Sequence, residues 1–130
     1  MTDFSFLKNF KVEDFQCHCP ACAHDPSRPY TKTEVMRAVQ ALRDRMREPL
    51  VITRGVSCAA HNKAVGGAGD SRHLPQHADA VDIACADSHE AFIIINYALN
   101  QGDFTAFRVY PHHVHLDARP GKAMFIASPE

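Results

Sequence analysis

Two histidines and an aspartate in the second half of the chain have the side-chain types of a metal site. His73 follows a polar turn, Asp82 lies within an apolar run, and His113 and His115 are separated by one valine. Zinc in catalytic sites typically has three nitrogen or oxygen ligands from the protein and one position for water or substrate. Structural zinc usually has four ligands, which are often thiolates. A His, Asp, His set therefore favours a hydrolytic zinc centre.

The segments that carry these side chains have the alternating pattern of β-strands. Over residues 79–85, alternation places Asp82 on one face and apolar side chains on the other, where Cys85 is an ordinary core residue. Over residues 113–117, both histidines share a face with Asp117. Taken alone, His73 could be a surface residue, and 113–117 an exposed strand face. A half-buried carboxylate such as Asp82, however, needs a cation or several hydrogen-bond donors.

Other patterns predict the elements around these strands. Apolar residues recur at helical spacing from Thr33 to Glu48, after a capping box formed by Thr31 and Glu34, and Pro49 ends this helix. The remaining expected elements are a strand at 50–53, a polar loop with a Gly66-Gly67 turn, a helix at 89–100, and strands at 104–110 and 123–127 that flank 113–117. The sequence thus predicts an α+β fold, in which a small antiparallel sheet carries the zinc site and helices pack on its other side.

Length and charge limit the possible function classes. With 130 residues we expect a single domain, 1–130, that includes the cysteine-rich segment 10–30. The net charge of −1 and the absence of Lys/Arg clusters argue against binding to nucleic acid or a membrane surface. Nine histidines suit a transition metal. We see no signal peptide or membrane span, so we expect synthesis in a cytoplasm and no membrane insertion.

The chain resembles a known family of enzymes in several motifs. These motifs are Thr53 to Asn62, Val65 to Ala68, Ser71 to Leu74, Ala80 to Ile83 and Val114 to Arg119. They are similar to motifs of the zinc D-alanyl-D-alanine carboxypeptidase-like peptidases, a group that also contains lysostaphin-type enzymes and the hedgehog domain. The lead-in from Phe10 to Phe15 and the cysteine-rich turn resemble the phage endolysin-like and bacterial murein-peptidase branch.

The resemblance implies that His73, Asp82 and His115 bind zinc, and that His113 is the first histidine of the family's His-x-His pair. It also implies hydrolysis of a peptide bond in peptidoglycan stems, with zinc activating water and a nearby base taking the proton. The usual spacing from His to Asp is six residues, whereas eight separate His73 from Asp82. Asp79 is consequently a weaker rival ligand.

The catalytic base and the arginine depart from the family pattern. Many relatives have a carboxylate three residues before the last histidine, where this chain has His112. We favour His113 as the base, with His112 second, because imidazole has a suitable pKa. The family's Ser-Gly-x-Arg motif has its ends exchanged here, so Arg54 is the candidate transition-state arginine and Ser57 stands at the usual arginine position.

Three further residues match the family pattern or share a face with the site. Asp117 is placed to hold an imidazole in the right tautomer, or else to form a salt bridge with an arginine. His61 and Asn62 match a family His-Asn pair, which we interpret as hydrogen-bonding residues around the glycine turn rather than as ligands.

The cysteines form a second candidate site. Cys17, Cys19 and Cys22 are close in sequence, and the family pattern brings Cys58 near them. This set suits a second, structural zinc ion, a disulfide between Cys58 and one of the three, or free thiols. The sequence leaves the three alternatives open.

These observations predict a zinc metallopeptidase that acts on bacterial peptidoglycan as a monomer. A catalytic domain without a signal peptide indicates a phage or prophage endolysin, made in the host cytoplasm and acting on the wall after release. Two alternatives remain: a D,D-dipeptidase acting on free wall fragments, and a non-catalytic zinc module that binds murein or a protein. The motifs do not identify the stem-peptide bond.

Overall fold

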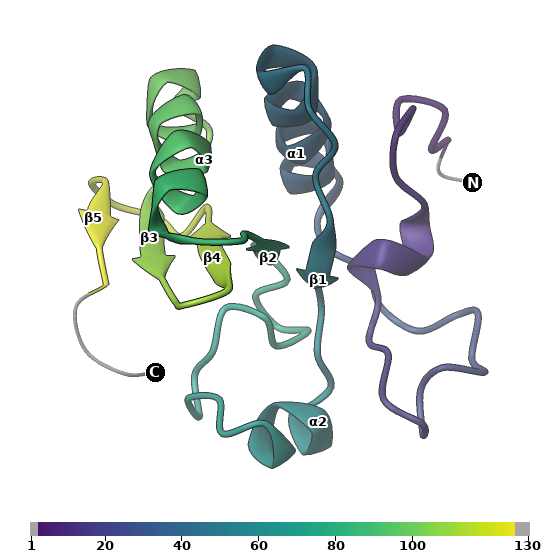
Figure 1. Cartoon of the computed structure of the whole chain (residues 1–130). Helices are drawn as coiled ribbons and strands as arrows, with labels where there is room; N and C mark the ends of the chain where they lie inside the picture. The colour runs from purple at the N-terminus through teal and green to yellow at the C-terminus, as the bar shows by residue number, and fades with distance from the viewer. Residues whose placement is uncertain (1–2, 127–130) are drawn as a thin grey trace.

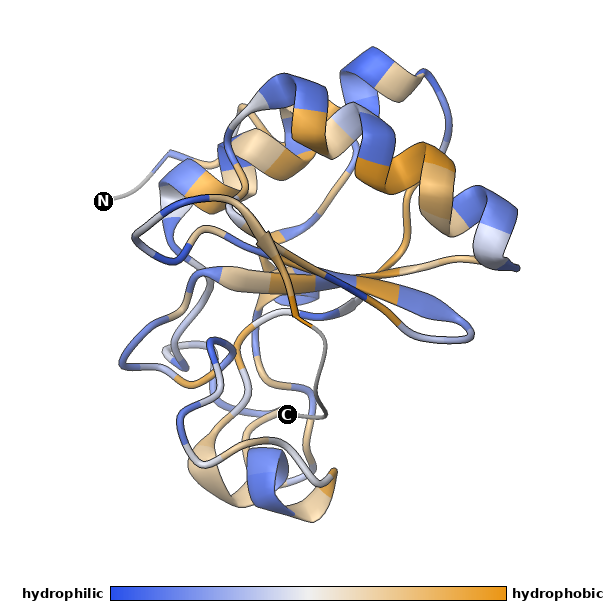
Figure 2. Ribbon diagram, turned by 90° about the vertical axis from the view of Figure 1, so that its left-hand side faces the viewer, coloured by the Kyte–Doolittle hydropathy of each residue, from blue (hydrophilic) through white to orange (hydrophobic). Residues whose placement is uncertain are grey.

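A computed structural model describes residues 3–126 and shows an α+β architecture (Figure 1). The elements in chain order are η1 (Val12–Phe15), α1 (Thr33–Met46), β1 (Ile52–Arg54), α2 (Ala59–Ala64), β2 (Ala80–Ala84), α3 (Ser88–Gln101), β3 (Ala106–Val109), β4 (His113–Asp117) and β5 (Met124–Phe125). The two long helices cover one face of the sheet, and the segment containing α2 lies on the opposite side (Figures 1 and 2). The predicted fold class is confirmed.

The sheet is mostly antiparallel and has the strand order β1-β2-β4-β3-β5. In the centre, β2 pairs with β4 so that Asp82 lies directly opposite His115. The neighbouring pairs place Arg54 of β1 opposite Asp82 and Arg108 of β3 opposite His115. One polar row therefore crosses four strands on a single face.

The other face of the sheet forms the hydrophobic core. The two long helices and the central strands supply much of it, with these fully buried side chains: Met36, Val39, Leu42, Val81, Ile83, Ile94, Ala98, Phe107, Val114 and Leu116. Cys85 also lies in this core, as predicted. Because side chains alternate along a strand, burying the valines and isoleucine of β2 and β4 directs Asp82 and His115 to the opposite face.

The helix ends follow local chemistry. In α3, the Asp87 side chain accepts a hydrogen bond from the backbone N–H of Glu90, and Gly102 ends the helix with a φ of 84°. Helix α1 ends at Met46, two residues earlier than predicted, because Arg47 adopts a left-handed conformation and Pro49 restricts the residue before it. Both long helices thus occur where the sequence predicts them.

Three local predictions are wrong. The predicted capping box is absent. Lys32 is the N-cap of α1, and its side chain makes no capping hydrogen bond. The hydroxyl of Thr31, which is buried, donates a hydrogen bond to the carbonyl oxygen of Phe15 instead. The expected polar loop contains the short helix α2, where the Cys58 thiol accepts from the N–H of His61. Strand β5 pairs in parallel with β3 and not with β4, because β2 occupies the other edge of β4. Ala127 of the predicted last strand lies outside the described residues.

The N-terminal segment packs against β1 and shares the core. Phe15 is fully buried, and its backbone C=O accepts hydrogen bonds from the N–H groups of Thr31 and Val56. Gly55 fits against it closely, since a Cβ there would lie 2.6 Å from Phe15 Cα. None of the helices within residues 3–126 has the length and apolar composition of a membrane span.

Candidate metal centre and active site

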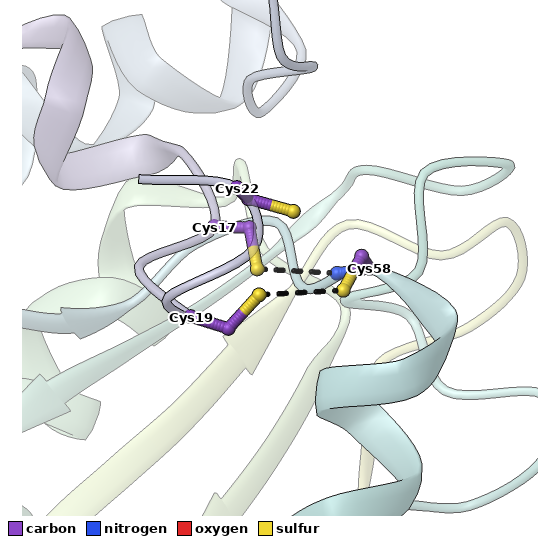
Figure 3. A group of neighbouring side chains, drawn as sticks. All are labelled: Cys17, Cys19, Cys22 and Cys58. Atoms are coloured by element: carbon purple, nitrogen blue, oxygen red, sulfur yellow. Dashed lines mark hydrogen bonds between the residues drawn. The ribbon is translucent and has the colours of Figure 1, made fainter. Parts of the chain in front are cut away.

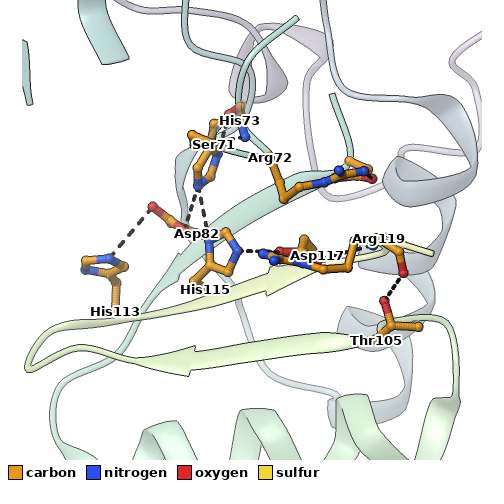
Figure 4. A network of polar contacts seen from close by, with 11 residues as sticks. Ser71, Arg72, His73, Asp82, Thr105, His113, His115, Asp117 and Arg119 are labelled. Carbon is orange, nitrogen blue, oxygen red and sulfur yellow. Dashed lines mark hydrogen bonds and ion pairs between the residues drawn. The ribbon is translucent and has the colours of Figure 1, made fainter. Parts of the chain in front are cut away.

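The structure brings His73, Asp82 and His115 together on the polar face of the sheet (Figure 4). Asp82 Oδ1 lies 3.1 Å from His73 Nε2 and 3.1 Å from His115 Nδ1, and the two nitrogens are 3.2 Å apart. All three residues are buried. Ligand atoms about 2.0–2.2 Å from a tetrahedral zinc ion would be about 3.3–3.6 Å apart. The spacing of the three atoms therefore fits one zinc ion.

The outer nitrogen of each imidazole is fixed by an acceptor. His73 Nδ1 lies 2.7 Å from the carbonyl oxygen of Gly55, and His115 Nε2 lies 2.7 Å from Asp117 Oδ2. Because these oxygens accept, each outer nitrogen carries the proton, and a neutral ring directs a lone pair toward Asp82. Three acceptors then converge on one point, which needs a cation at its centre. The donor set thus has the chemistry of a metal site.

The two buried carboxylates are held ionised by their neighbours. Burial would raise the pKa of Asp82, but hydrogen bonds and charge from His115 and His73, which act when these rings carry a second proton, lower it below the usual value. Burial also opposes ionisation of Asp117, yet hydrogen bonds from Arg119 and His115 bring its pKa down to about 2. Arg119 donates to Asp117 Oδ1 from Nε at 2.8 Å. Both alternatives for Asp117, an imidazole contact and a salt bridge, occur together.

Asp79, the rival ligand, is used elsewhere. Its carboxylate is buried and pairs with Arg72, whose Nε and Nη2 lie 3.0 and 2.5 Å from its two oxygens. The segment between His73 and Asp82 contains a turn, in which the N–H groups of His77 and Ala78 donate hydrogen bonds to the carbonyl oxygen of Leu74. The two extra residues therefore leave His73 within reach of Asp82.

His113 lies at the edge of the metal centre, whereas His112 does not. His113 Nε2 is 3.7 Å from Asp82 Oδ2, and its ring stacks on Tyr110 with centroids 4.2 Å apart. Burial lowers the pKa of His113, although Asp82 acts in the opposite direction. His112 is exposed in the turn before β4 and does not line the cavity described below. Of the two candidate bases, the geometry favours His113.

Arg54 is held in place by the residues that follow it. Its Nε donates to Ser57 Oγ at 2.7 Å, and Nη2 donates to Asn62 Oδ1 at 2.7 Å. Asn62 is buried, and its Nδ2 donates to the carbonyl oxygen of Ala68. Gly67 packs against this amide so closely that a Cβ would lie 2.2 Å from Asn62 Oδ1. Arg54 and Ser57, which stand exchanged relative to the family motif, are thus hydrogen-bonded to each other.

These side chains surround a solvent-accessible cavity of about 430 Å³. Its lining includes the three proposed ligands and Thr53, Arg54, His61, Val65, Gly66, Gly67, Ser71, Arg108, Tyr110 and His113. The sequence analysis missed Arg108 on β3 and Tyr110 directly after this strand, with the Arg108 guanidinium 4.8 Å from the centre of the Tyr110 ring. Their alternation with Phe107 and Val109 was the available signal.

The structure also brings together the four candidate cysteines. The sulfur atoms of Cys17, Cys19, Cys22 and Cys58 all lie within 4.8 Å of one another, and all four thiols are free (Figure 3). The predicted proximity of Cys58 to the N-terminal cysteines agrees with this arrangement. The cluster is separate from the His and Asp set.

The α+β fold and a His, Asp, His set in an accessible cavity define a metallohydrolase. The chain belongs to the peptidase M15 family, since the family model described as Peptidase M15 matches residues 8–117. No curated protein matches the chain. Membership makes the protein a peptidase of a zinc-dependent family, and His73, Asp82 and His115 are a metal-binding group with the matching chemistry.

Proposed function

We propose that this protein is a zinc peptidase that cleaves a peptide bond in peptidoglycan stem peptides, and that it serves as a phage or prophage endolysin. The observation that carries the proposal is the polar row across the sheet, in which Asp82 and His115 are flanked by Arg54 and Arg108 along one cavity. A cation centre flanked by the arginines Arg54 and Arg108 suits a peptide substrate rich in carboxylates, as murein stems are.

In this proposal a zinc ion held by His73, Asp82 and His115 would polarise the scissile carbonyl and make water a better nucleophile near neutral pH. His113 accepts the proton, since burial favours its neutral form and its Nε2 faces Asp82 at 3.7 Å. Arg54 stabilises the negative charge that develops on the carbonyl oxygen, because Ser57 and Asn62 fix its guanidinium beforehand.

Arg108 is the candidate substrate-binding residue on the other side of the centre. It lies opposite His115 on the neighbouring strand and lines the cavity with Tyr110. An arginine there can pair with a carboxylate of the stem peptide and align the neighbouring bond with the metal centre. The proposal includes action as a monomer, without nucleic-acid binding or membrane insertion, on the wall after release from the host cytoplasm.

The test is mass spectrometry of two substrates incubated with zinc-loaded protein: purified sacculi and free D-alanyl-D-alanine. New soluble fragments from sacculi, with the dipeptide left intact, would support the endolysin and identify the bond from the fragment masses. Cleavage of the dipeptide alone would make the protein a dipeptidase for free wall fragments. If both substrates stay intact in the presence of folded, zinc-loaded protein, the proposal of a peptidoglycan peptidase is refuted. The result would then favour the non-catalytic binding module.

A further inference from the structure

The second cluster of metal-ligating side chains lies outside the site described above. It joins two segments that are far apart in sequence, the loop of Cys17, Cys19 and Cys22 and the N-cap of α2 at Cys58 (Figure 3). Cys17 and Cys19 are buried, and the other two thiols are half-buried. None of the four belongs to the hydrophobic core cluster, whereas Cys85 does. Packing of the core therefore does not explain the cluster.

Local backbone geometry directs the thiols toward one point. A turn follows Cys19, whose carbonyl oxygen accepts from the N–H groups of Cys22 and Ala23 at 3.0 and 2.9 Å, and this turn brings Cys22 back beside Cys19. The N–H of Cys58 donates to Cys17 Sγ at 3.4 Å, and that of His61 donates to Cys58 Sγ at 3.4 Å. Such backbone N–H contacts to sulfur are outer hydrogen bonds of the kind that orient a metal-binding side chain.

The separations fit a tetrahedral thiolate site. Cys19 Sγ and Cys58 Sγ are 3.7 Å apart, and the four sulfurs lie within 4.8 Å of one another. Sulfurs bound to a tetrahedral zinc ion at about 2.3 Å would be about 3.8 Å apart. A disulfide needs about 2.05 Å between sulfurs, and one such bond would leave two further thiols crowded against it.

We propose that Cys17, Cys19, Cys22 and Cys58 bind a structural zinc ion that attaches the N-terminal segment to the wall of the active-site cavity. Four protein ligands fill the coordination sphere and leave no position for substrate, so this ion has no catalytic role. Cys58 follows Ser57, which contacts Arg54, and precedes His61 of the cavity lining. The ion would therefore restrain the loop that positions Arg54.

The metal content of purified protein tests this proposal without any assay of turnover. We expect two zinc ions per chain in the wild type and one in His73→Ala, which lacks a ligand of the other site. Cobalt bound to His73→Ala should show the near-ultraviolet thiolate-to-cobalt charge-transfer absorption that a His and Asp site cannot give. This readout keeps the structural site distinguishable from a failure of the proposed function.

Cys22→Ser is the informative ligand variant, because its half-buried thiol can be replaced without placing a hydroxyl in the core. It should lose one equivalent of zinc and the charge-transfer band, whereas Cys85→Ala, the matched control, should keep both. If either variant fails to fold, release of one zinc ion from wild-type protein by a mercurial thiol reagent gives the same information.

Two results would overturn the proposal. His73→Ala protein without zinc and with five titratable thiols would show that the cysteines are free. His73→Ala protein without zinc and with two fewer thiols, and a mass lower by two hydrogens, would show a disulfide in place of the metal.

Discussion

Replacing Asp117 by asparagine tests how the protein prepares His115 for metal binding. The buried carboxylate accepts from His115 Nε2 at 2.7 Å and from Arg119 Nε at 2.8 Å. In Asp117→Asn, one oxygen can still accept from Arg119, but the amide NH2 then faces the N–H of His115. The ring relieves this donor–donor contact by moving its proton to Nδ1, the atom that faces Asp82. The ligand nitrogen would lose its lone pair.

The magnitude follows from the burial of the pair. Loss of an outer hydrogen-bond partner typically lowers metal affinity about 10–100-fold. Asp117 and His115 are at most 1 % exposed, so water cannot replace the missing acceptor. We therefore expect a loss at the upper end of this range. Zinc affinity should fall about 100-fold, which corresponds to about 2.7 kcal/mol of binding free energy.

Competition with a chromogenic chelator at neutral pH measures this loss, and circular dichroism checks that each variant is folded. Asp79→Asn is the matched control, because Asp79 is also a buried partner of an arginine, Arg72, but contacts no proposed ligand. Its zinc affinity should equal that of the wild type. The reasoning fails if folded Asp117→Asn binds zinc within twofold of the wild type, or if the two variants weaken binding equally.

Three further predictions concern the base, the arginine and acid stability. His113→Ala should lower kcat by about 10²–10⁴-fold with unchanged zinc content, while His112→Ala stays near wild type; equal losses in steady-state assays would contradict the assignment. Arg54→Ala should lower kcat about 100-fold at unchanged zinc affinity, and wild-type turnover of stem-peptide fragments would exclude its role. Asp117 has a folded-state pKa of about 2 against about 3.9 unfolded, so its contribution to the stability of metal-free protein is present above about pH 4 and is lost as the pH falls toward 2. Acid unfolding of Asp117→Asn should therefore be less steep in this range, and an identical profile would argue against the shift.

The central strands and their polar face could be predicted because a strand has a simple period. Once Val81 and Ile83 are assigned to the core, Asp82 must point away from it, and the same holds for His115 between Val114 and Leu116. Pairing of these two strands then places the carboxylate beside the imidazole. Alternation was sufficient for the face of each strand, whereas the pairing of β2 with β4 was not predicted, because 123–127 was expected in the place that β2 occupies.

The remainder of the site depends on contacts that no local pattern encodes. Asp79 and Asp82 are both buried acidic residues near one strand, and only the tertiary position of Arg72 separates the structural from the ligating carboxylate. Arg108 belongs to the cavity because β3 pairs with β4, an arrangement set by strand order. Helix α2 is too short for a clear period, and a thiol caps it where a hydroxyl or carboxylate is usual.

The most direct test of the account is hydrolysis of purified peptidoglycan by metal-free protein titrated with zinc, in parallel with Asp82→Asn. Fragments should appear only as zinc fills the His73, Asp82 and His115 site, and the variant should release none at any zinc concentration that keeps it folded. Undiminished hydrolysis by chelator-treated protein, or by Asp82→Asn, would contradict the assignment of this centre as a zinc peptidase site.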